Sequence, residues 1–113
     1  MRRSVKRMLF LTIVLAVSAC NTKTTSIRTL LADPGKYDGK TVRIAGEVQG
    51  SIGALGFGGY EVKDNTGTLP VVSEGGGVPA RGAQVAVEGT FRAAFTLGTQ
   101  SRAVIIEKKR VSR

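Results

Sequence analysis

The sequence predicts an all-β domain, either a small barrel or a compact sandwich, preceded by one short helix. Five short runs have the character of strands, and most of them alternate apolar and polar residues with a period of two. Only one segment has helical spacing, and the 113 residues include 15 glycines. Short, glycine-rich strands are typical of barrels and sandwiches that protect their sheet edges. The five runs are 41–49, 60–64, 69–71, 84–92 and 103–107.

The expected helix lies directly before the first strand. Ser26 can cap it, and Ile27, Leu30 and Leu31 share one face at helical spacing. It is expected to stop at residues 33–35, because the residue before a proline is pushed out of the α region. Only one or two turns fit, so a single short helix is predicted.

Alternation gives each strand a core face. In the first run, Val42, Ile44 and Val48 fall on one face, and Arg43 and Glu47 fall on the other. In the later runs, the same alternation selects Tyr60, Val62, Leu69, Val71, Val85, Val87 and Phe91 for the core.

Glycine and proline interrupt the strands at defined points. Gly46 and Gly89 lie inside two runs, where glycine is costly unless the strand bends around a barrel corner. Pro70 cannot donate to a ladder, so the third strand needs an edge or bulge there. A partly open barrel provides such a place where its third and fifth strands meet only in part.

A tight hairpin connection, NTG at 65–67, joins the second and third runs. Asp64 and Thr66 can hydrogen-bond to amides of this turn, and Gly67 allows a positive φ.

Three segments together resemble the OB-fold pattern: GKTVRIAGEVQ (39–49), YEVKDNTGTLPVV (60–72) and PARGAQVAVEGTF (79–91). The resemblance extends over roughly residues 37–107 and is strongest to anticodon-binding-like OB domains and to the exported bacterial OB-fold family. It implies a five-stranded Greek-key barrel. Many OB folds carry a helix between their third and fourth strands, but residues 75–82 are too short and glycine-rich for one. We therefore expect the segment before the first strand to cover that end of the barrel.

The first residues have the pattern of an export signal. Four basic residues within 2–7 precede an uncharged apolar run, 8–17, and a small-residue cleavage site follows. The run is too short to span a membrane as a helix, which takes about 20 apolar residues.

The end of this signal resembles the lipobox of bacterial lipoproteins. Val17, Ser18 and Ala19 precede Cys20, the only cysteine of the chain. The resemblance implies that a signal peptidase recognises the first three and cuts before Cys20, whose sulfur then carries diacylglycerol. An exported protein with a single free thiol otherwise risks an intermolecular disulfide. The alternatives are an ordinary secretory signal with a chance cysteine, or an uncleaved anchor.

These segments divide the chain into a signal peptide (1–19), a polar lipid-anchored tether (20–25) and an OB-fold domain (26–113). Lipoproteins retained in the inner membrane often carry aspartate after the cysteine, and here that position is Asn21. The expected location is therefore the outer membrane, with the domain facing the periplasm, if the source is Gram-negative.

The formal charge of +9 is concentrated at the two ends. Residues 20–107 hold nine basic and eight acidic side chains, a balance of +1. The basic composition is therefore weaker support for a nucleic-acid partner than it first suggests.

A candidate ligand face borders the apolar, glycine-rich loop 51–59. A strand follows this loop, so it does not fit a phosphate-binding loop, which leads into a helix. Single-strand binding by OB folds uses aromatic platforms with basic side chains, for which Phe57 and Tyr60 are candidates. Tyr60 shares a face with Val62, which favours a core role. The residues assigned to the face are Arg43, Leu55, Phe57, Lys63 and Arg92.

Basic residues also gather at the C-terminal end. Lys108, Lys109, Arg110 and Arg113 can bind anionic phospholipid, lipopolysaccharide or phosphates. The simpler interpretation is a solvated end of the last strand that prevents edge pairing.

Catalytic chemistry has little support. The chain has no histidine, the usual general base and commonest metal ligand. Glu47, Glu61 and Glu88 point outward on separate strands and form no recognisable acid–base pair. We therefore expect a non-enzymatic protein with no metal and no cofactor.

Three functions remain open. The exported OB family implies a module that binds a protein or glycan of the cell envelope, with a role in envelope maintenance or stress tolerance. The first alternative is an oligonucleotide- or polyanion-binding domain. The second is a structural subunit that packs a strand edge against a larger envelope assembly.

Overall fold

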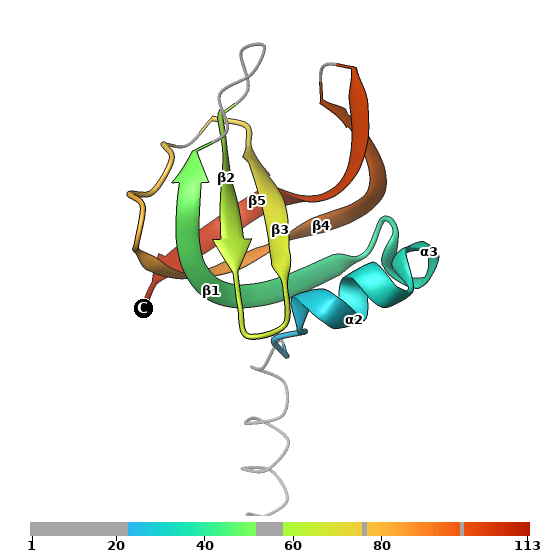
Figure 1. The fold of residues 1–113 in the computed structure, drawn as a ribbon, viewed down its shortest axis with the longest axis horizontal. Helices are drawn as coiled ribbons and strands as arrows, with labels where there is room; N and C mark the ends of the chain where they lie inside the picture. The colour runs from blue at the N-terminus through green and yellow to red at the C-terminus, as the bar shows by residue number, and fades with distance from the viewer. Residues whose placement is uncertain (1–22, 52–57, 76, 98) are drawn as a thin grey trace, which may run out of the picture.

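A computed structural model describes residues 23–51, 58–75, 77–97 and 99–113. Five strands form a closed barrel in the order β1-β2-β3-β5-β4, and short helices lie at one end of it (Figure 1). This is the OB-fold arrangement that the sequence predicted. The elements are α2 (Ile27–Ala32), α3 (Pro34–Tyr37), β1 (Thr41–Ser51), β2 (Gly58–Lys63), β3 (Thr68–Ser73), β4 (Gln84–Leu97) and β5 (Gln100–Ser112).

Helix α2 begins and ends where the sequence predicted. The Ser26 Oγ accepts a hydrogen bond from the Thr29 amide at 3.2 Å, which satisfies one of the free amides of the first turn. Ile27 and Leu30 are fully buried, but Leu31 is 44% exposed, so its assignment to the apolar face was wrong. One residue of helix turns the side chain by about 100°, which carries Leu31 away from the barrel.

The prediction of a single helix was also incomplete, because a one-turn helix, α3, follows at once. Pro34 occupies its first turn, where the fixed φ of proline suits a helix and its missing N–H is not needed. The same proline therefore ends one helix and starts the next.

Gly46 and Gly89 lie where one strand presses against the backbone of another. A Cβ at Gly46 would meet the Lys63 carbonyl oxygen at 2.2 Å, and one at Gly89 would meet the Ile106 carbonyl oxygen at 2.1 Å. The β4–β5 ladder also shifts register between residues 88 and 89. Close backbone approach, rather than positive φ, explains both glycines.

Pro70 lies just before the shortest backbone ladder of the barrel. It pairs with Glu61 of β2, while the parallel ladder between β3 and β5 comprises only Val71 and Val72 and their partners. The prediction that the third and fifth strands meet only in part is confirmed.

The NTG connection is the predicted tight turn, closed by a 3.0 Å hydrogen bond from the Asp64 amide to the Gly67 carbonyl. The expected positive φ at Gly67 was wrong, since among the described glycines only Gly39 and Gly82 adopt one. Instead, a Cβ at Gly67 would lie 3.3 Å from the Ile27 side chain. A Cβ at Gly67 would therefore press on the buried Ile27 side chain of α2.

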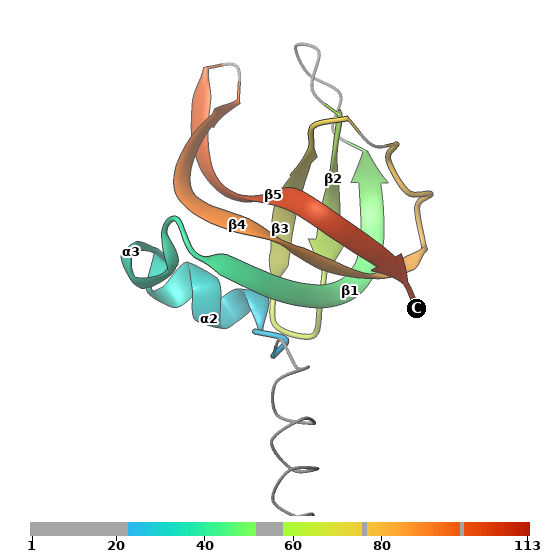
Figure 2. The ribbon, with the colours of Figure 1, turned by 180° about the vertical axis from the view of Figure 1, so that it is seen from behind.

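Residues 77–83 contain no helix, as predicted, and Ile27 and Leu30 of α2 join the barrel core instead. β4 and β5 continue beyond the barrel as a curved two-stranded arm (Figures 1 and 2). The largest fully buried side chains are Tyr60, Phe91, Ile27, Leu30, Ile44, Leu69, Ile105, Val48, Val62, Val71, Val85 and Val87.

Candidate functional site

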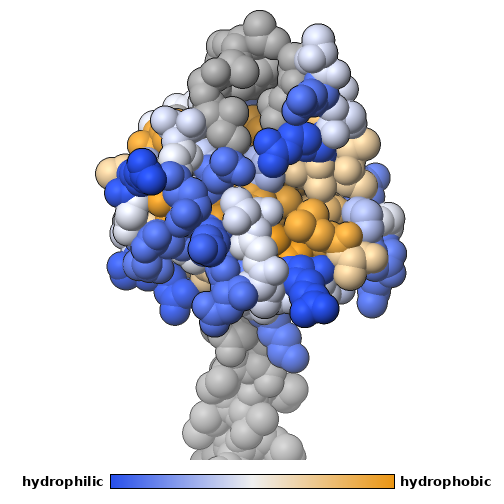
Figure 3. Space-filling model, viewed as in Figure 1, coloured by the Kyte–Doolittle hydropathy of each residue, from blue (hydrophilic) through white to orange (hydrophobic). Residues whose placement is uncertain are grey.

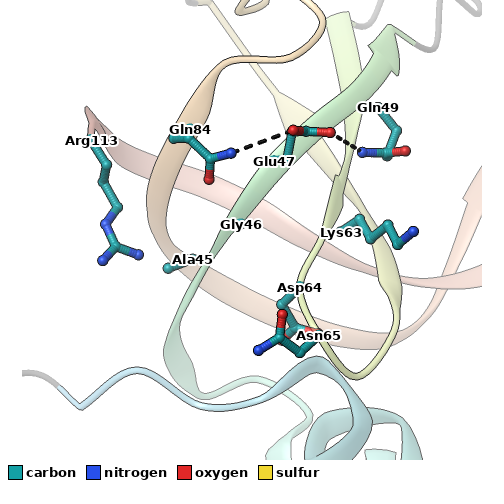
Figure 4. A pocket seen from close by; sticks show the side chains of 9 residues that line it. All are labelled: Ala45, Gly46, Glu47, Gln49, Lys63, Asp64, Asn65, Gln84 and Arg113. Carbon is teal, nitrogen blue, oxygen red and sulfur yellow. Dashed lines mark hydrogen bonds between the residues drawn. The ribbon is translucent and has the colours of Figure 1, made fainter.

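A polar pocket of about 420 Å³ opens where β1 passes from its partner β4 to its partner β2 (Figure 4). Glu47 marks the crossing, because it pairs with Gln84 on one side and with Lys63 on the other. The pocket combines β1, the end of β2 with the β2–β3 turn, the start of β4 and Arg113, which directly follows β5. Its lining residues are Ala45, Gly46, Glu47, Gln49, Lys63, Asp64, Asn65, Gln84 and Arg113.

Glu47 organises one wall of this pocket. Its carboxylate accepts hydrogen bonds from Gln49 Nε2 at 3.0 Å and from Gln84 Nε2 at 3.5 Å (Figure 4). Each amide keeps further donor and acceptor capacity, because a primary amide has two N–H groups and a carbonyl oxygen. The wall therefore offers fixed groups of both hydrogen-bonding kinds.

Asp64 lines the pocket but its carboxylate is already engaged. Oδ1 accepts from the Thr66 amide at 2.7 Å and the Gly67 amide at 3.0 Å, while Oδ2 accepts from the Ile27 amide at 2.9 Å. Burial alone would raise the pKa of Asp64, but hydrogen bonds from Thr66, Ile27 and Gly67 outweigh it and hold that pKa below its usual range. This carboxylate fixes α2 to the β2–β3 turn.

The charges around the pocket balance. Two carboxylates and two cations line it, together with three side-chain amides. A polyanion needs an excess of positive charge, which this lining does not provide. The arrangement suits a polar ligand that is uncharged or carries both signs.

The basic members of the predicted ligand face do not lie together. Lys63 lines the polar pocket, and Arg43 lines a smaller one of about 130 Å³ beside Glu88 and Lys109. Arg92 lies on β4 with its Nε 3.9 Å from Asp38 Oδ1. The other two members, Leu55 and Phe57, lie outside the described residues, as do Val17, Ser18, Ala19, Cys20 and Asn21.

Three of the four basic C-terminal residues, Lys108, Lys109 and Arg110, belong to β5, and Arg113 directly follows it. The four divide among three surroundings. Lys108 Nζ lies 3.3 Å from Thr41 Oγ1, and Lys109 Nζ lies 3.6 Å from Glu88 Oε2. Arg110 turns toward Glu107 and the Tyr60 ring, whereas Arg113 lines the polar pocket.

Sequence reasoning missed a polar cluster at the core boundary. Tyr60 is fully buried, as the alternation predicted, and its hydroxyl donates to Glu107. Arg110 Nη1 lies 3.0 Å from the same carboxylate, and the guanidinium sits 5.4 Å from the Tyr60 ring centroid. Burial, and then the neighbouring Glu107 carboxylate, raise the pKa of Tyr60 far above its ordinary value. Nothing in the alternation marks Glu107, because it ends an apolar run.

Within the part of the chain that the structure describes, no three His, Cys, Asp or Glu side chains gather in a way that could hold a metal ion. Over the same residues, no helix is long and apolar enough to cross a membrane. Two of the outward glutamates pair with cations: Glu61 with Arg102 at 3.8 Å and Glu88 with Lys109 at 3.6 Å.

Comparison with known proteins supports the fold. The chain matches no family model and no curated protein. Among solved structures, it is similar to asparaginyl-tRNA synthetase from Pyrococcus horikoshii, with 24% identity and a TM-score of 0.57 over 68% of this chain and 20% of the synthetase. It is also similar to the hypothetical protein YgiW from E. coli, with 18% identity and a TM-score of 0.57 over 80% of this chain and 90% of YgiW.

At these identities the comparison concerns fold alone. The chain spans about a fifth of the synthetase and most of YgiW. It is an OB-fold domain, and OB barrels accommodate oligonucleotides, oligosaccharides and proteins alike.

Proposed function

We propose that this protein is a lipid-anchored, non-enzymatic binding module of the bacterial cell envelope, and that its polar pocket binds a glycan. The observation that carries the proposal is the charge-balanced lining of that pocket, with its three side-chain amides. A sugar hydroxyl donates and accepts hydrogen bonds, as an amide side chain does. A phosphate backbone would require a net positive surface instead.

The anchor is supported by the position of the tether. The Thr25 amide donates to the Arg43 carbonyl at 2.7 Å, and Thr24 forms a bridge with the same residue. The barrel is therefore engaged four residues after Cys20, and cleavage before that cysteine would spare every core residue named above. The polar residue Asn21 after the cysteine favours the outer membrane.

The anchor is tested by expressing the full chain and a Cys20→Ser variant in a bacterial host. The expected wild-type product is membrane-bound and begins at an acylated Cys20, measured by fractionation and by mass spectrometry of its first peptide. The Cys20→Ser protein is expected to lack the lipid mass. An unacylated wild-type protein that retains residues 1–19 would contradict the anchor.

Glycan binding is tested by calorimetry with solubilised peptidoglycan fragments and detergent-purified full-length protein. Gln84→Ala is expected to weaken binding about tenfold, because loss of one such hydrogen bond costs about 1.4 kcal/mol. Gln100→Ala is the matched control, since it changes the same residue type on the exposed arm, outside the pocket. Equal effects of the two substitutions would remove the pocket from the proposal.

The second candidate function is oligonucleotide binding, favoured by the four basic residues at the C-terminal end and by the likeness to part of a tRNA synthetase. It predicts binding to single-stranded DNA that weakens steeply with salt, with a slope set by the number of phosphate contacts. The same protein preparation, titrated with a thymidine oligonucleotide at two salt concentrations, distinguishes the two functions.

A further inference from the structure

The outer side of the β1–β4–β5 sheet carries a row of charged side chains. Arg43 of β1 pairs with Glu88 of β4, and Glu88 pairs with Lys109 of β5. Directly paired residues point to the same side of a sheet. Lys108 belongs to this side too, because its Nζ lies 3.3 Å from Thr41 Oγ1, and Thr41 is two residues from Arg43 on the same strand.

We call Arg43, Lys108 and Lys109 the basic face. The side chain of Lys109 is 71% exposed, whereas that of Glu88, the acidic residue between Arg43 and Lys109, is only 18% exposed. Val111, which lines the small pocket beside Arg43 and Lys109, is 56% exposed. Figure 2 shows this side of the barrel, with β1, β4 and β5 side by side.

The tether leaves the fold at the edge of this face. Thr24 bridges to Arg43 in parallel, and the exposed Lys23 precedes it. Adjacent strands are about 4.8 Å apart, so three spacings, or roughly 14 Å, separate the tether from β5. Four extended residues from Cys20 to Thr24 reach at most about 14 Å. A lipid on Cys20 therefore keeps the Arg43 edge of the basic face within roughly 14 Å of its attachment point, close enough for the barrel to turn this face toward the leaflet.

We propose that the basic face docks on anionic phospholipid headgroups of the leaflet that holds the Cys20 lipid. This rests on the proposed lipid anchor. Charge complementarity supports it, because three cations face outward with Glu88 largely covered. The face lacks the aromatic platforms that single-stranded nucleic acid uses: Ala86 and Val111 are its apolar members.

The face is too small to hold the protein on a membrane by itself. Each basic residue near an anionic surface contributes about fivefold to binding. The lipid anchor makes this weak binding sufficient, because it keeps the basic face at a high effective concentration relative to the headgroups. The lipid then provides retention and the basic face provides orientation.

The test uses the acylated full-length protein in vesicles of phosphatidylcholine with or without phosphatidylglycerol. A single cysteine replaces either Val111, on the basic face, or Gln100, on the arm, and carries a fluorophore quenched by headgroup-labelled lipid. Cys20 is acylated and takes no label. We expect stronger quenching at position 111 than at position 100, only when phosphatidylglycerol is present and at low salt.

The charge requirement is tested in the same vesicles. Lys108→Gln/Lys109→Gln is expected to lower the ratio of docked to undocked protein about 25-fold and to abolish the difference in quenching. Arg81→Gln/Arg102→Gln is the control, because it removes the same two positive charges outside the basic face. This variant is expected to keep the difference in quenching between positions 111 and 100.

The outcomes separate the two proposals. Docking is overturned, while the anchor stands, if the protein floats with the vesicles but both labels are quenched equally. The same holds if the lysine substitutions leave the quenching unchanged. If the protein does not float with vesicles at all, the anchor fails and docking fails with it.

Discussion

At the scale of single residues, the glycines of the barrel differ sharply in what they permit. The sites of Gly46 and Gly89 leave no room for a Cβ beside the carbonyl of a neighbouring strand. Gly50 lies on the same strand as Gly46 with nothing within 4 Å of a Cβ. We therefore expect substitution by alanine to have different effects on stability at these two positions of one strand.

Gly46→Ala is expected to destabilise the protein by about 3 kcal/mol, because the backbone of β2 must move to admit the new methyl group. Gly50→Ala is expected to be neutral or to stabilise by about 0.5 kcal/mol, since alanine restricts the unfolded chain. Urea unfolding followed by circular dichroism measures both. Equal stability of the two variants would show that the close contact at Gly46 is not what requires glycine.

Asp64 predicts a pH dependence of stability. Its folded pKa lies below the unfolded value, which is about 3.9. As the pH falls, the unfolded chain therefore binds the proton first, so the stabilisation is complete above about pH 5 and is lost as the pH falls through the folded pKa. Asp64→Asn is expected to cost about 2 kcal/mol at pH 7 and less at pH 3.

Unfolding of both proteins by urea at pH 7 and pH 3 gives the comparison. The variant should lose less stability than the wild type between these values, because asparagine does not titrate and one of its side-chain positions donates where Oδ1 or Oδ2 accepted. Parallel pH profiles would mean that the hydrogen bonds accepted by the Asp64 carboxylate contribute nothing to acid stability.

At the scale of elements, α2 packs Ile27 and Leu30 into the barrel core, in place of the helix that many OB folds carry between their third and fourth strands. Leu30→Ala is expected to cost about 3 kcal/mol, since it leaves a cavity beside fully buried neighbours. Leu31→Ala, one position along the same helix and 44% exposed, should cost less than about 0.5 kcal/mol. Both substitutions replace leucine by alanine in the same helix, so they change helix propensity equally. A difference in stability between the two variants therefore reports core packing.

Alternation predicted the strands of the barrel well, because a period of two directly records which side chains face the core. It did not predict the full length of β4 and β5, since residues 94–97 and 99–102 continue the two strands as an arm beyond the barrel. Alternation did not predict the polar pocket either. Its lining residues are distant in sequence, for example Glu47, Lys63, Gln84 and Arg113. They come together only because β1 pairs first with β4 and then with β2.

The exposed surface also has features that alternation did not predict. Figure 3 shows hydrophilic side chains over much of one face, with a smaller apolar gathering to the right of its centre. Leu31 and Val78 are among the large apolar side chains exposed to solvent. Sequence alternation assigns strand faces, but these positions lie outside strands, where burial depends on what packs nearby.

At the scale of the whole molecule, closure of the barrel depends on a short seam. The parallel ladder between β3 and β5 comprises only two residue pairs. Side chains reinforce this region: Tyr60 of β2 donates to Glu107 of β5, and the Ser73 Oγ of β3 lies 3.4 Å from the same carboxylate. Arg110 completes the cluster at 3.0 Å from Glu107. The cluster therefore joins three strands where the backbone ladder is shortest.

Tyr60→Phe is expected to destabilise the whole barrel by about 2 kcal/mol, because Glu107 loses a donor at a partly buried position. The Tyr60 pKa is raised on folding, so above the unfolded value of about 10 the unfolded chain releases its proton while the folded chain keeps it. Wild-type stability should therefore decline as the pH rises above 10, and Tyr60→Phe should decline less. Phenolate absorbance in folded protein and urea unfolding at pH 8 and pH 10.5 measure this. A Tyr60 that ionises near pH 10 in the folded protein would show that the cluster does not close the barrel as described.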